Sequence, residues 1–215
     1  SKKYGSWLFL GIILTDGDIS YDYPEDNNCG TCDACLKICP TNAFVSPYKL
    51  DSRKCISYLT IEYKGHISEE YRKPIGNRVF GCDDCLAICP WNKFATISNE
   101  IKFKNKNSFS FTNIENLLKL TEDSFRKTFS KTPVKRSGYI SFIRNVLIAS
   151  GNSKNKKLIK VILPYLKHKN PILRAMAVWS IGQHLDKKNI LKHYKNCIDE
   201  EDKDVKKEWD RVMKF

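Results

Sequence analysis

The pattern of apolar and polar positions changes near residue 100. Before that point, apolar residues come in short runs between turn residues, beginning with the run at residues 4–14. That run is shorter than the ~20 apolar residues needed to cross a bilayer, and we expect a buried strand or core segment. Two short helices are predicted next. One is capped by Asp51 and carries Cys55, and the other begins at Ser68 and is stopped by Pro74.

After a polar, lysine-rich stretch at residues 100–110, which is the best candidate linker, the pattern predicts helices to the end of the chain. Thr112 begins a capping-box pattern, and Thr121 is placed to cap a helix that ends near Phe129. A further apolar stripe at helical spacing leaves Arg144 and Asn145 outside it. Its members are Tyr139, Phe142, Ile143, Val146 and Leu147.

Weak internal similarity connects the last helices. Residues 172–174 and 205–207 occupy similar places about 33 residues apart. Asn170 and Pro171 supply a cap and a proline at the first helical position. Helix pairs repeating at this interval favour a short α-solenoid of the HEAT type, with a plain helical bundle as the alternative.

Charge is distributed unevenly between the two parts. The 215 residues carry a net charge of +13. Residues 1–95 hold 11 Lys/Arg against 12 Asp/Glu, a net of −1, and residues 96–215 hold 26 against 12, a net of +14. A genome bias towards lysine would raise the number of basic residues in both parts. The asymmetry therefore favours a second part that binds a polyanion. Candidate phosphate contacts are Lys131, Lys135, Arg136, Arg144, Lys154, Lys156, Lys157, Lys167, Lys169 and Arg174.

Eight of the nine cysteines follow iron–sulfur spacing. Residues 29–40 form a complete C-x2-C-x2-C-x3-C-P run, which in bacterial ferredoxins holds [4Fe–4S] clusters. Residues 82–90 repeat it without the first cysteine, because Val79 stands at that position, and Cys55 makes up the deficit. Such spacing in a chain without a signal peptide indicates a reducing cytoplasm. The ninth, Cys197, is expected to be a free, partly buried thiol.

The fourth cysteine of each run should reach the cluster of the other run. This rule assigns Cys29, Cys32, Cys35 and Cys89 to one cluster and Cys39, Cys55, Cys82 and Cys85 to the other. Zinc also favours paired C-x2-C units, but it does not explain a complete run and its near copy. The predicted fold class is therefore α+β, mostly α. A ferredoxin-like module with two [4Fe–4S] clusters lies in residues 1–99, followed by a basic HEAT-like helical domain in residues 100–215.

Five stretches together resemble the epoxyqueuosine reductase family, which acts on tRNA in queuosine synthesis. They are Tyr4-Gly-Ser-Trp-Leu-Phe-Leu-Gly11, the first cysteine run with Leu50-Asp-Ser-Arg-Lys-Cys-Ile-Ser-Tyr-Leu-Thr-Ile-Glu62, Ile75-Gly-Asn-Arg-Val-Phe-Gly-Cys-Asp-Asp-Cys85, and Cys89-Pro-Trp-Asn-Lys93. The resemblance covers nearly the whole chain, with specific motifs up to Ala95 and a looser helical match beyond.

The resemblance implies a reaction and its cofactors. It implies two-electron reductive removal of the epoxide oxygen from epoxyqueuosine at the wobble position of tRNA. Two clusters would deliver electrons singly to cobalamin, which carries the hard chemistry. Ser57, Tyr58 and Asp83 resemble family positions close to the corrin. The helical domain would hold the anticodon region of tRNA, and an electron-donor protein would supply electrons to a cytoplasmic monomer that does not enter the membrane.

Two departures from the family pattern limit the resemblance. The family's cobalamin-binding domain, with its acidic proton donor, precedes the segment where this chain begins, so residues 1–99 would hold only the end of that domain's core beside the cluster module. We therefore expect the chain alone to lack turnover and to hold cobalamin weakly. Ile12 stands where the family is expected to have an acidic residue. No catalytic acid is assigned.

Two other functions compete with this one. The first is a ferredoxin-like electron carrier, or a reductive-dehalogenase-type cluster module, whose helical tail docks a protein partner. The second is a nucleic-acid-binding helical repeat with purely structural clusters. The basic helical tail argues against a bare carrier, and reversible reduction would argue against purely structural clusters.

Overall fold

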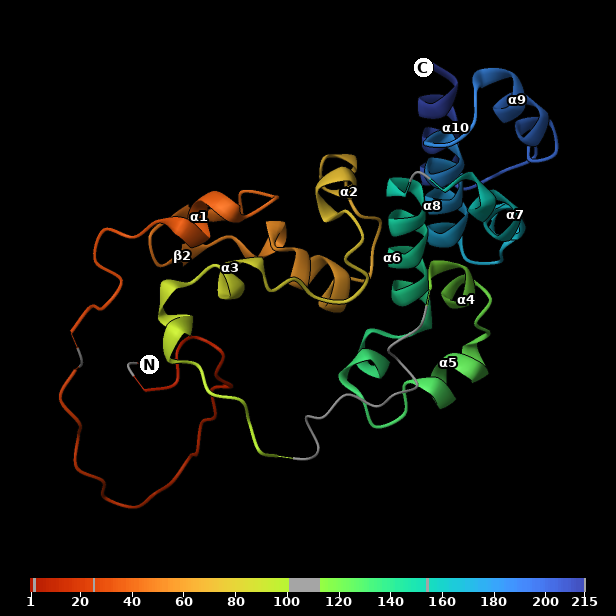
Figure 1. Ribbon diagram of the computed structural model, residues 1–215. Helices are drawn as coiled ribbons and strands as arrows, with labels where there is room; N and C mark the ends of the chain where they lie inside the picture. Colours follow the sequence, from red (N-terminus) through yellow and green to blue (C-terminus); the bar gives the residue numbers. More distant parts are fainter. Residues whose placement is uncertain (2, 25, 101–112, 154, 215) are drawn as a thin grey trace.

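The computed structural model describes residues 1, 3–24, 26–100, 113–153 and 155–214. The cysteine-rich part (residues 1–99) and the helical part (residues 113–214) lie side by side, with α2 of the first against α6 of the second (Figure 1). The proposed linker at residues 100–110 lies almost entirely outside the described residues.

Short elements make up the cysteine-rich part, as expected for loops that must curl around metal sites. They are α1 (Ala34–Ile38), β1 (Phe44–Ser46), β2 (Lys49–Leu50), η1 (Ser52–Lys54), η2 (Tyr58–Glu62), α2 (Glu69–Ile75), α3 (Asp84–Ala87) and η3 (Pro90–Phe94). Strands β1 and β2 pair antiparallel, with Phe44 opposite Leu50. Pro90 begins η3, where its missing N–H costs nothing.

The region around Cys55 differs from the prediction. Asp51 is a cap, but it caps the short 3-10 turn η1, where its side chain accepts a hydrogen bond from the Arg53 N–H. Cys55 follows in extended backbone rather than within a helix. The next turn widens into the π-helix η2, in which the Tyr63 N–H bonds to the Tyr58 carbonyl. The local signal for a cap was right, and the length of the capped helix was wrong.

The helix after Ser68 also differs in how it ends. Pro74 lies inside α2, which continues to Ile75. The end is made by Gly76, whose φ of +61° disfavours any residue with a Cβ and whose N–H bonds to the Lys73 carbonyl. A proline one residue before the end of a helix removes one donor without breaking the earlier turns.

The apolar run near the start is not buried, so that prediction was wrong. Phe9, Leu10, Ile12, Ile13 and Leu14 are 88–95% exposed. Among the described residues no strand pairs with this run. Its beginning is held by a hydrogen bond of 2.6 Å from Ser6 Oγ to Asn92 Oδ1.

The helical part consists of helices and short turns. They are α4 (Ile114–Leu118), α5 (Glu122–Thr128), η6 (Pro133–Ser137), α6 (Tyr139–Asn152), η7 (Lys156–Leu158), α7 (Ile159–Ile162), η8 (Leu163–Lys167), α8 (Pro171–Gly182), α9 (Lys187–Lys195) and α10 (Lys203–Lys214). Thr121 caps α5 in a capping box, and Asn170 caps α8 ahead of Pro171, as predicted. The cap of α4 is Asn113, one residue after the predicted Thr112.

Helices α6, α8 and α10 form the core of the helical part. Helix α8 packs between the other two (Figure 1). The predicted apolar stripe of α6 is buried, with Ile143, Val146 and Leu147 fully so. Trp209 of α10 is 2% exposed and packs against Tyr194 of α9. Among the described residues no helix has the length and apolarity that a membrane crossing requires.

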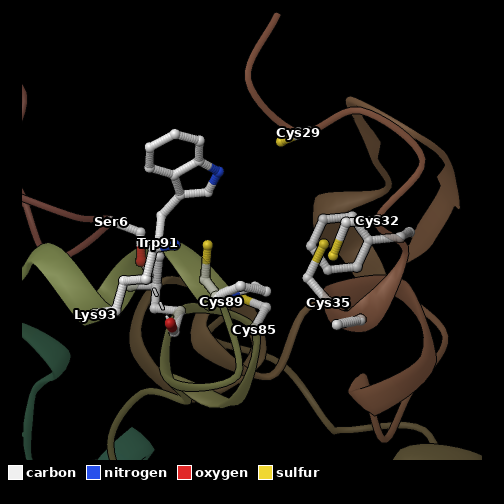
Figure 2. Close-up of a pocket in the computed structure, with 12 residues that line it drawn as sticks. Ser6, Cys29, Cys32, Cys35, Cys85, Cys89, Trp91 and Lys93 are labelled. Carbon is white, nitrogen blue, oxygen red and sulfur yellow. Dashed lines mark hydrogen bonds between the residues drawn. The ribbon is translucent and has the colours of Figure 1, made fainter. Parts of the chain in front are cut away.

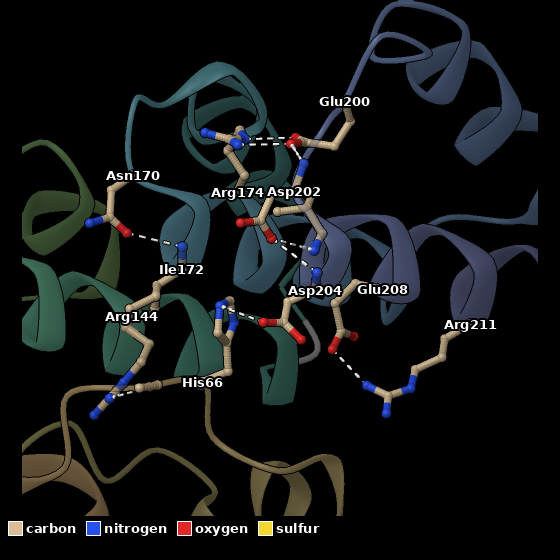
Figure 3. Close-up of polar contacts among 12 residues, drawn as sticks. His66, Arg144, Asn170, Ile172, Arg174, Glu200, Asp202, Asp204, Glu208 and Arg211 are labelled. Carbon is tan, nitrogen blue, oxygen red and sulfur yellow. Dashed lines mark hydrogen bonds and ion pairs between the residues drawn. The ribbon is translucent and has the colours of Figure 1, made fainter.

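Two arginines proposed as phosphate contacts have structural roles instead. Arg144 is fully buried and donates hydrogen bonds to the main-chain oxygens of Leu59, Tyr63 and Gly65. Arg174 makes a two-bond ion pair with Glu200 at 2.7 and 2.8 Å (Figure 3). A guanidinium with its donors engaged inside the protein is not available to phosphate, so both residues leave the candidate set.

Candidate metal centre

The two cysteine runs face each other across a cavity of about 430 Å³, here called the first cavity. Figure 2 shows Cys29, Cys32 and Cys35 on one side, with Cys85 and Cys89 on the other beside Trp91. All five thiols line the cavity, together with Phe44 and Leu86 among the apolar residues. This cavity therefore brings together Cys29, Cys32, Cys35 and Cys89, the four thiols that the sequence assigned to one cluster.

Hydrogen bonds between the runs hold the first cavity in shape. The Trp91 indole N–H donates to the Asn28 carbonyl at 3.0 Å, which joins the second run to the residue before Cys29. The Asn27 side chain accepts from the Cys29 N–H and from the Tyr48 hydroxyl. These contacts fix a loop that has no regular secondary structure of its own.

A second, smaller cavity of about 60 Å³ adjoins the first and is here called the second cavity. Cys39, Cys55, Cys82 and Cys85 line it, with Ile56 and Leu50 among the apolar neighbours. These are the four thiols that the sequence assigned to the other cluster. Because Cys85 and Phe44 line both cavities, the two are neighbours that share a wall.

All nine cysteines are free thiols, and their spacing bears on the kind of metal they could hold. A tetrahedral zinc site with Zn–S bonds of 2.3 Å places its sulfurs ~3.8 Å apart. Among the described residues, the group of three ligand atoms within 4.8 Å of one another is that of His66, Asp202 and Asp204, and it contains no cysteine. In the described part of the chain, no three cysteine thiols stand as close together as in a filled zinc site.

The surroundings of the thiols affect their ionisation in opposite directions. Burial raises the pKa of Cys82 and of Cys85, and the pKa of Cys85 is raised further by the neighbouring Cys55 and Cys82. Burial also opposes ionisation of Cys39, but hydrogen bonds from the Ala43 N–H and from Thr41 outweigh it and lower the Cys39 pKa. A metal cation is bound by thiolates, not by thiols. Binding of a metal by these cysteines would therefore release their protons.

Ser57 and Asp83 lie beside Cys82, and Tyr58 follows Ser57 in the chain. None of the three lines either cysteine cavity. The Ser57 hydroxyl donates to the Cys82 carbonyl at 3.1 Å and accepts from the Cys82 N–H at 3.0 Å. Tyr58 is half-buried, and Asp83 is exposed. The role of these three residues at a corrin stays a prediction, and the structure adds a supporting role for Ser57 at a cysteine backbone.

The basic candidates that remain on the surface form a smaller set than the sequence proposed. Arg136 pairs with Glu62 on the surface, and Lys154 lies outside the described residues. The exposed lysines that remain are Lys131, Lys135, Lys156, Lys157, Lys167 and Lys169.

Comparison with known proteins shows what the chain is similar to. Residues 28–92 match the 4Fe-4S double cluster binding domain. An epoxyqueuosine reductase of Xanthomonas campestris is 42% identical over 181 residues, 84% of this chain and 51% of that protein. The Escherichia coli enzyme is 36% identical over 189 residues, 88% of this chain and 50% of that protein. The chain is homologous to epoxyqueuosine reductases.

Solved structures of epoxyqueuosine reductases are similar over the same range. The Streptococcus thermophilus enzyme matches with a TM-score of 0.84 at 30% identity, over 99% of this chain and 56% of that one. An epoxyqueuosine reductase crystallised with an epoxyqueuosine-modified stem loop of tRNA-Tyr matches with a TM-score of 0.82 at 29% identity, over 91% and 52%. The similarity extends well beyond residues 28–92, which disfavours a bare ferredoxin-like carrier. The chain spans about half the length of these reductases.

Sequence reasoning missed two residues of the helical part that bond to the main chain of the cysteine-rich part. Asn145 was noted only as lying outside an apolar stripe, and Arg144 was also proposed as a phosphate contact, yet both are 0% exposed. The available signal was their position, because two adjacent long polar residues inside an otherwise apolar helix need buried partners.

Proposed function

We propose that this chain forms the iron–sulfur and RNA-binding portion of an epoxyqueuosine reductase. The observation that carries the proposal is the gathering of eight thiols around two adjoining cavities, each with the four thiols that one cubane requires. Homology to epoxyqueuosine reductases across both parts of the chain supports it.

In this proposal Cys29, Cys32, Cys35 and Cys89 hold one [4Fe–4S] cluster in the first cavity. Cys39, Cys55, Cys82 and Cys85 hold the other in the second. Each cluster, when bound, supplies one electron at a time. The chain keeps the centres adjacent through the shared wall of Phe44 and Cys85 and limits water with apolar neighbours such as Trp91 and Ile56.

The reaction requires two electrons. Removing the epoxide oxygen of epoxyqueuosine as water consumes two electrons and two protons. We propose that cobalamin, which supplies the reducing chemistry when bound, is approached by the face around Ser57, Tyr58 and Asp83. The surface exposure of Asp83 supports this placement, while Ser57 acts through its bonds to the Cys82 backbone.

The helical part is proposed to hold the anticodon region of tRNA. Its net positive charge supports this role, as does the stem loop bound by the crystallised reductase. Helices α7 to α10 would form a short HEAT-like array, in which α8 and α10 begin 32 residues apart and pack against each other. We further propose that an electron-donor protein reduces a monomeric, cytoplasmic enzyme.

Anaerobic preparation followed by metal analysis and RNA binding tests this function. Two clusters predict about eight irons and eight sulfides per chain, with an EPR signal after reduction. The chain should also bind a tRNA-Tyr anticodon stem loop more tightly than a hairpin of equal length and unrelated sequence. Zinc in place of iron, or equal affinity for both RNAs, would contradict the proposal.

A further inference from the structure

Helix α6 directs three polar side chains at the main chain of the cysteine-rich part. Arg144 and Asn145 are 0% exposed, and Asn152 lies on the same side two turns later. Each donates hydrogen bonds to carbonyl oxygens across the boundary between the two parts. Buried amide and guanidinium groups whose hydrogen bonds are all made define the relative position of two packed segments more strictly than apolar contacts do.

Two of these side chains complete the irregular π-turn η2. In this turn the Tyr63 N–H bonds to the Tyr58 carbonyl, five residues back. The carbonyl of Leu59 accepts from Arg144 at 2.6 Å, and that of Thr60 accepts from Asn145 Nδ2 at 2.7 Å. Buried carbonyls need hydrogen-bond partners. Helix α6 supplies the donors for these two carbonyls at the end of the turn.

The same turn holds the backbone that leads into Cys82. The Ser57 hydroxyl bonds to both the N–H and the carbonyl of Cys82. The Thr60 hydroxyl accepts from the N–H of Gly81, whose φ is +78°. Cys55 lies three residues before the turn and accepts at its carbonyl from the Leu59 N–H at 2.9 Å.

Asn145 binds both segments at once. Its amide donates to the Thr60 carbonyl at 2.7 Å and to the Val79 carbonyl at 2.8 Å. One contact is on the turn that follows Cys55, and the other is three residues before Cys82. Its own oxygen accepts two bonds from Arg144, at 2.9 and 3.1 Å, which prevents the amide from rotating.

We infer that Asn145 is a positioning residue for the second cavity, setting the separation of the Cys55 and Cys82 thiols from the helical part. The inference rests on the proposed function, because it takes the second cavity as a cluster site. Asn145 does not contact the thiols. At metal centres, residues that do not bind the metal orient the residues that do. Asn145 would act in this way on Cys55 and Cys82, through the main chain beside them.

Asn152 provides a matched control on the same helix. Its amide also donates to two main-chain carbonyls of the cysteine-rich part, those of Arg72 at 2.7 Å and Gly76 at 2.9 Å. Both acceptors belong to α2 and its end, which carry no cysteine. Replacing either asparagine by aspartate keeps the shape and removes the two donors.

The test compares Asn145→Asp and Asn152→Asp in the full chain by iron analysis, EPR and redox titration. We expect Asn145→Asp to lose roughly half of its iron, or to shift the EPR signal and midpoint potential of one cluster only. Asn152→Asp should match the unaltered protein in both signals. Unchanged clusters in Asn145→Asp, or equal changes in both variants, would overturn the inference.

A milder variant and a metal-free measurement complete the test. Thr60→Val removes the hydroxyl that accepts from the Gly81 N–H and donates to the Ile56 carbonyl, and it should alter the same cluster even if Asn145→Asp does not fold. Its failure to do so would also count against the inference. In cluster-free protein, amide exchange at Gly81 and Cys82 should rise at least about tenfold in Asn145→Asp and not in Asn152→Asp. If the unaltered chain held no iron, the proposed function would fail, while exchange would still decide whether Asn145 holds this backbone.

Discussion

At the scale of single residues, burial separates side chains that look alike in the sequence. Arg136 and Arg144 are eight positions apart and both reach the cysteine-rich part. Arg136 pairs with Glu62 on the surface, whereas Arg144 serves three buried carbonyls and burial lowers its pKa to about 10. It therefore stays charged at neutral pH.

This difference predicts opposite outcomes for two alanine variants. Arg144→Ala leaves three carbonyls without donors and should lower the free energy of unfolding by at least roughly 3 kcal/mol. Arg136→Ala removes an exposed pair and should change it by less than about 1 kcal/mol. Denaturant unfolding of both variants measures this, and equal losses would contradict the assignment of Arg144 as an interface residue.

The cysteines give a second prediction at this scale. Cys55→Ala should remove one cluster, because Val79 leaves the second run one thiolate short, and should leave the cluster of Cys29, Cys32, Cys35 and Cys89 largely intact. Cys197→Ala is the control, since this thiol lies in the helical part and burial raises its pKa. Iron analysis with EPR checks both. Eight irons and an unchanged spectrum in Cys55→Ala would refute the ligand set.

At the scale of elements, ion pairs fix the helices to one another. Arg174 of α8 holds Glu200 in the segment before α10, and Glu200 in turn accepts from the Asp202 N–H. Arg72 of α2 binds Glu208 of α10 through two bonds, with both side chains at most 5% exposed. These pairs decide how α10 lies against the rest of the molecule.

The Arg174 pair makes stability depend on acid in a defined direction. Arg174 lowers the pKa of Glu200 below its ordinary value of 4.5. A lowered carboxyl pKa adds stability above the ordinary value, and that stability is lost as pH falls through the lowered one. Glu200→Gln should therefore lower the melting temperature at pH 7, and its difference from the unaltered protein should shrink near pH 3.5.

Thermal unfolding at several pH values measures this difference. Glu122→Gln provides a control, because Glu122 pairs with Arg126 on an exposed helix face and should cost less than about 1 kcal/mol. A difference for Glu200→Gln that stays constant from pH 7 to pH 3.5 would show that the charge of Glu200 is not the source of its effect.

At the scale of the whole molecule, the charge of the helical part predicts salt-dependent RNA binding. If about four phosphates are neutralised, affinity should fall with salt at a log–log slope of roughly −3 to −4. Replacing Lys156, Lys157, Lys167 and Lys169, all exposed, by alanine should weaken binding and flatten that slope.

A second set of four lysines controls for net charge alone. Lys203, Lys206, Lys207 and Lys214 are exposed on α10, and replacing them removes the same charge from another helix of the same part. This variant should keep most of the slope. Equal flattening by both sets would indicate a diffuse charge effect, and salt-independent binding would remove the RNA-binding role.

Local sequence signals were enough to predict the grouping of the cysteines and most of the helices. Cysteine spacing and the crossing of the fourth cysteine of each run predicted two sets of four thiols, because a cubane cluster needs four ligands, and the residues of each set line the same cavity. Local signals also sufficed at Thr121 and Asn170, since a cap depends only on neighbouring backbone. The apolar stripe of α6 could also be predicted, because its apolar residues recur at helical spacing.

The partners of individual side chains could not be predicted, because they depend on how the elements pack together. The tertiary structure showed that the run at residues 9–14 is exposed and that Arg144 and Arg174 are engaged within the protein. It also showed that Asn145 joins the segments after Cys55 and before Cys82. These outcomes depend on contacts between residues 26 to 85 positions apart, and hydrophobic period and local propensity carry no information about such partners.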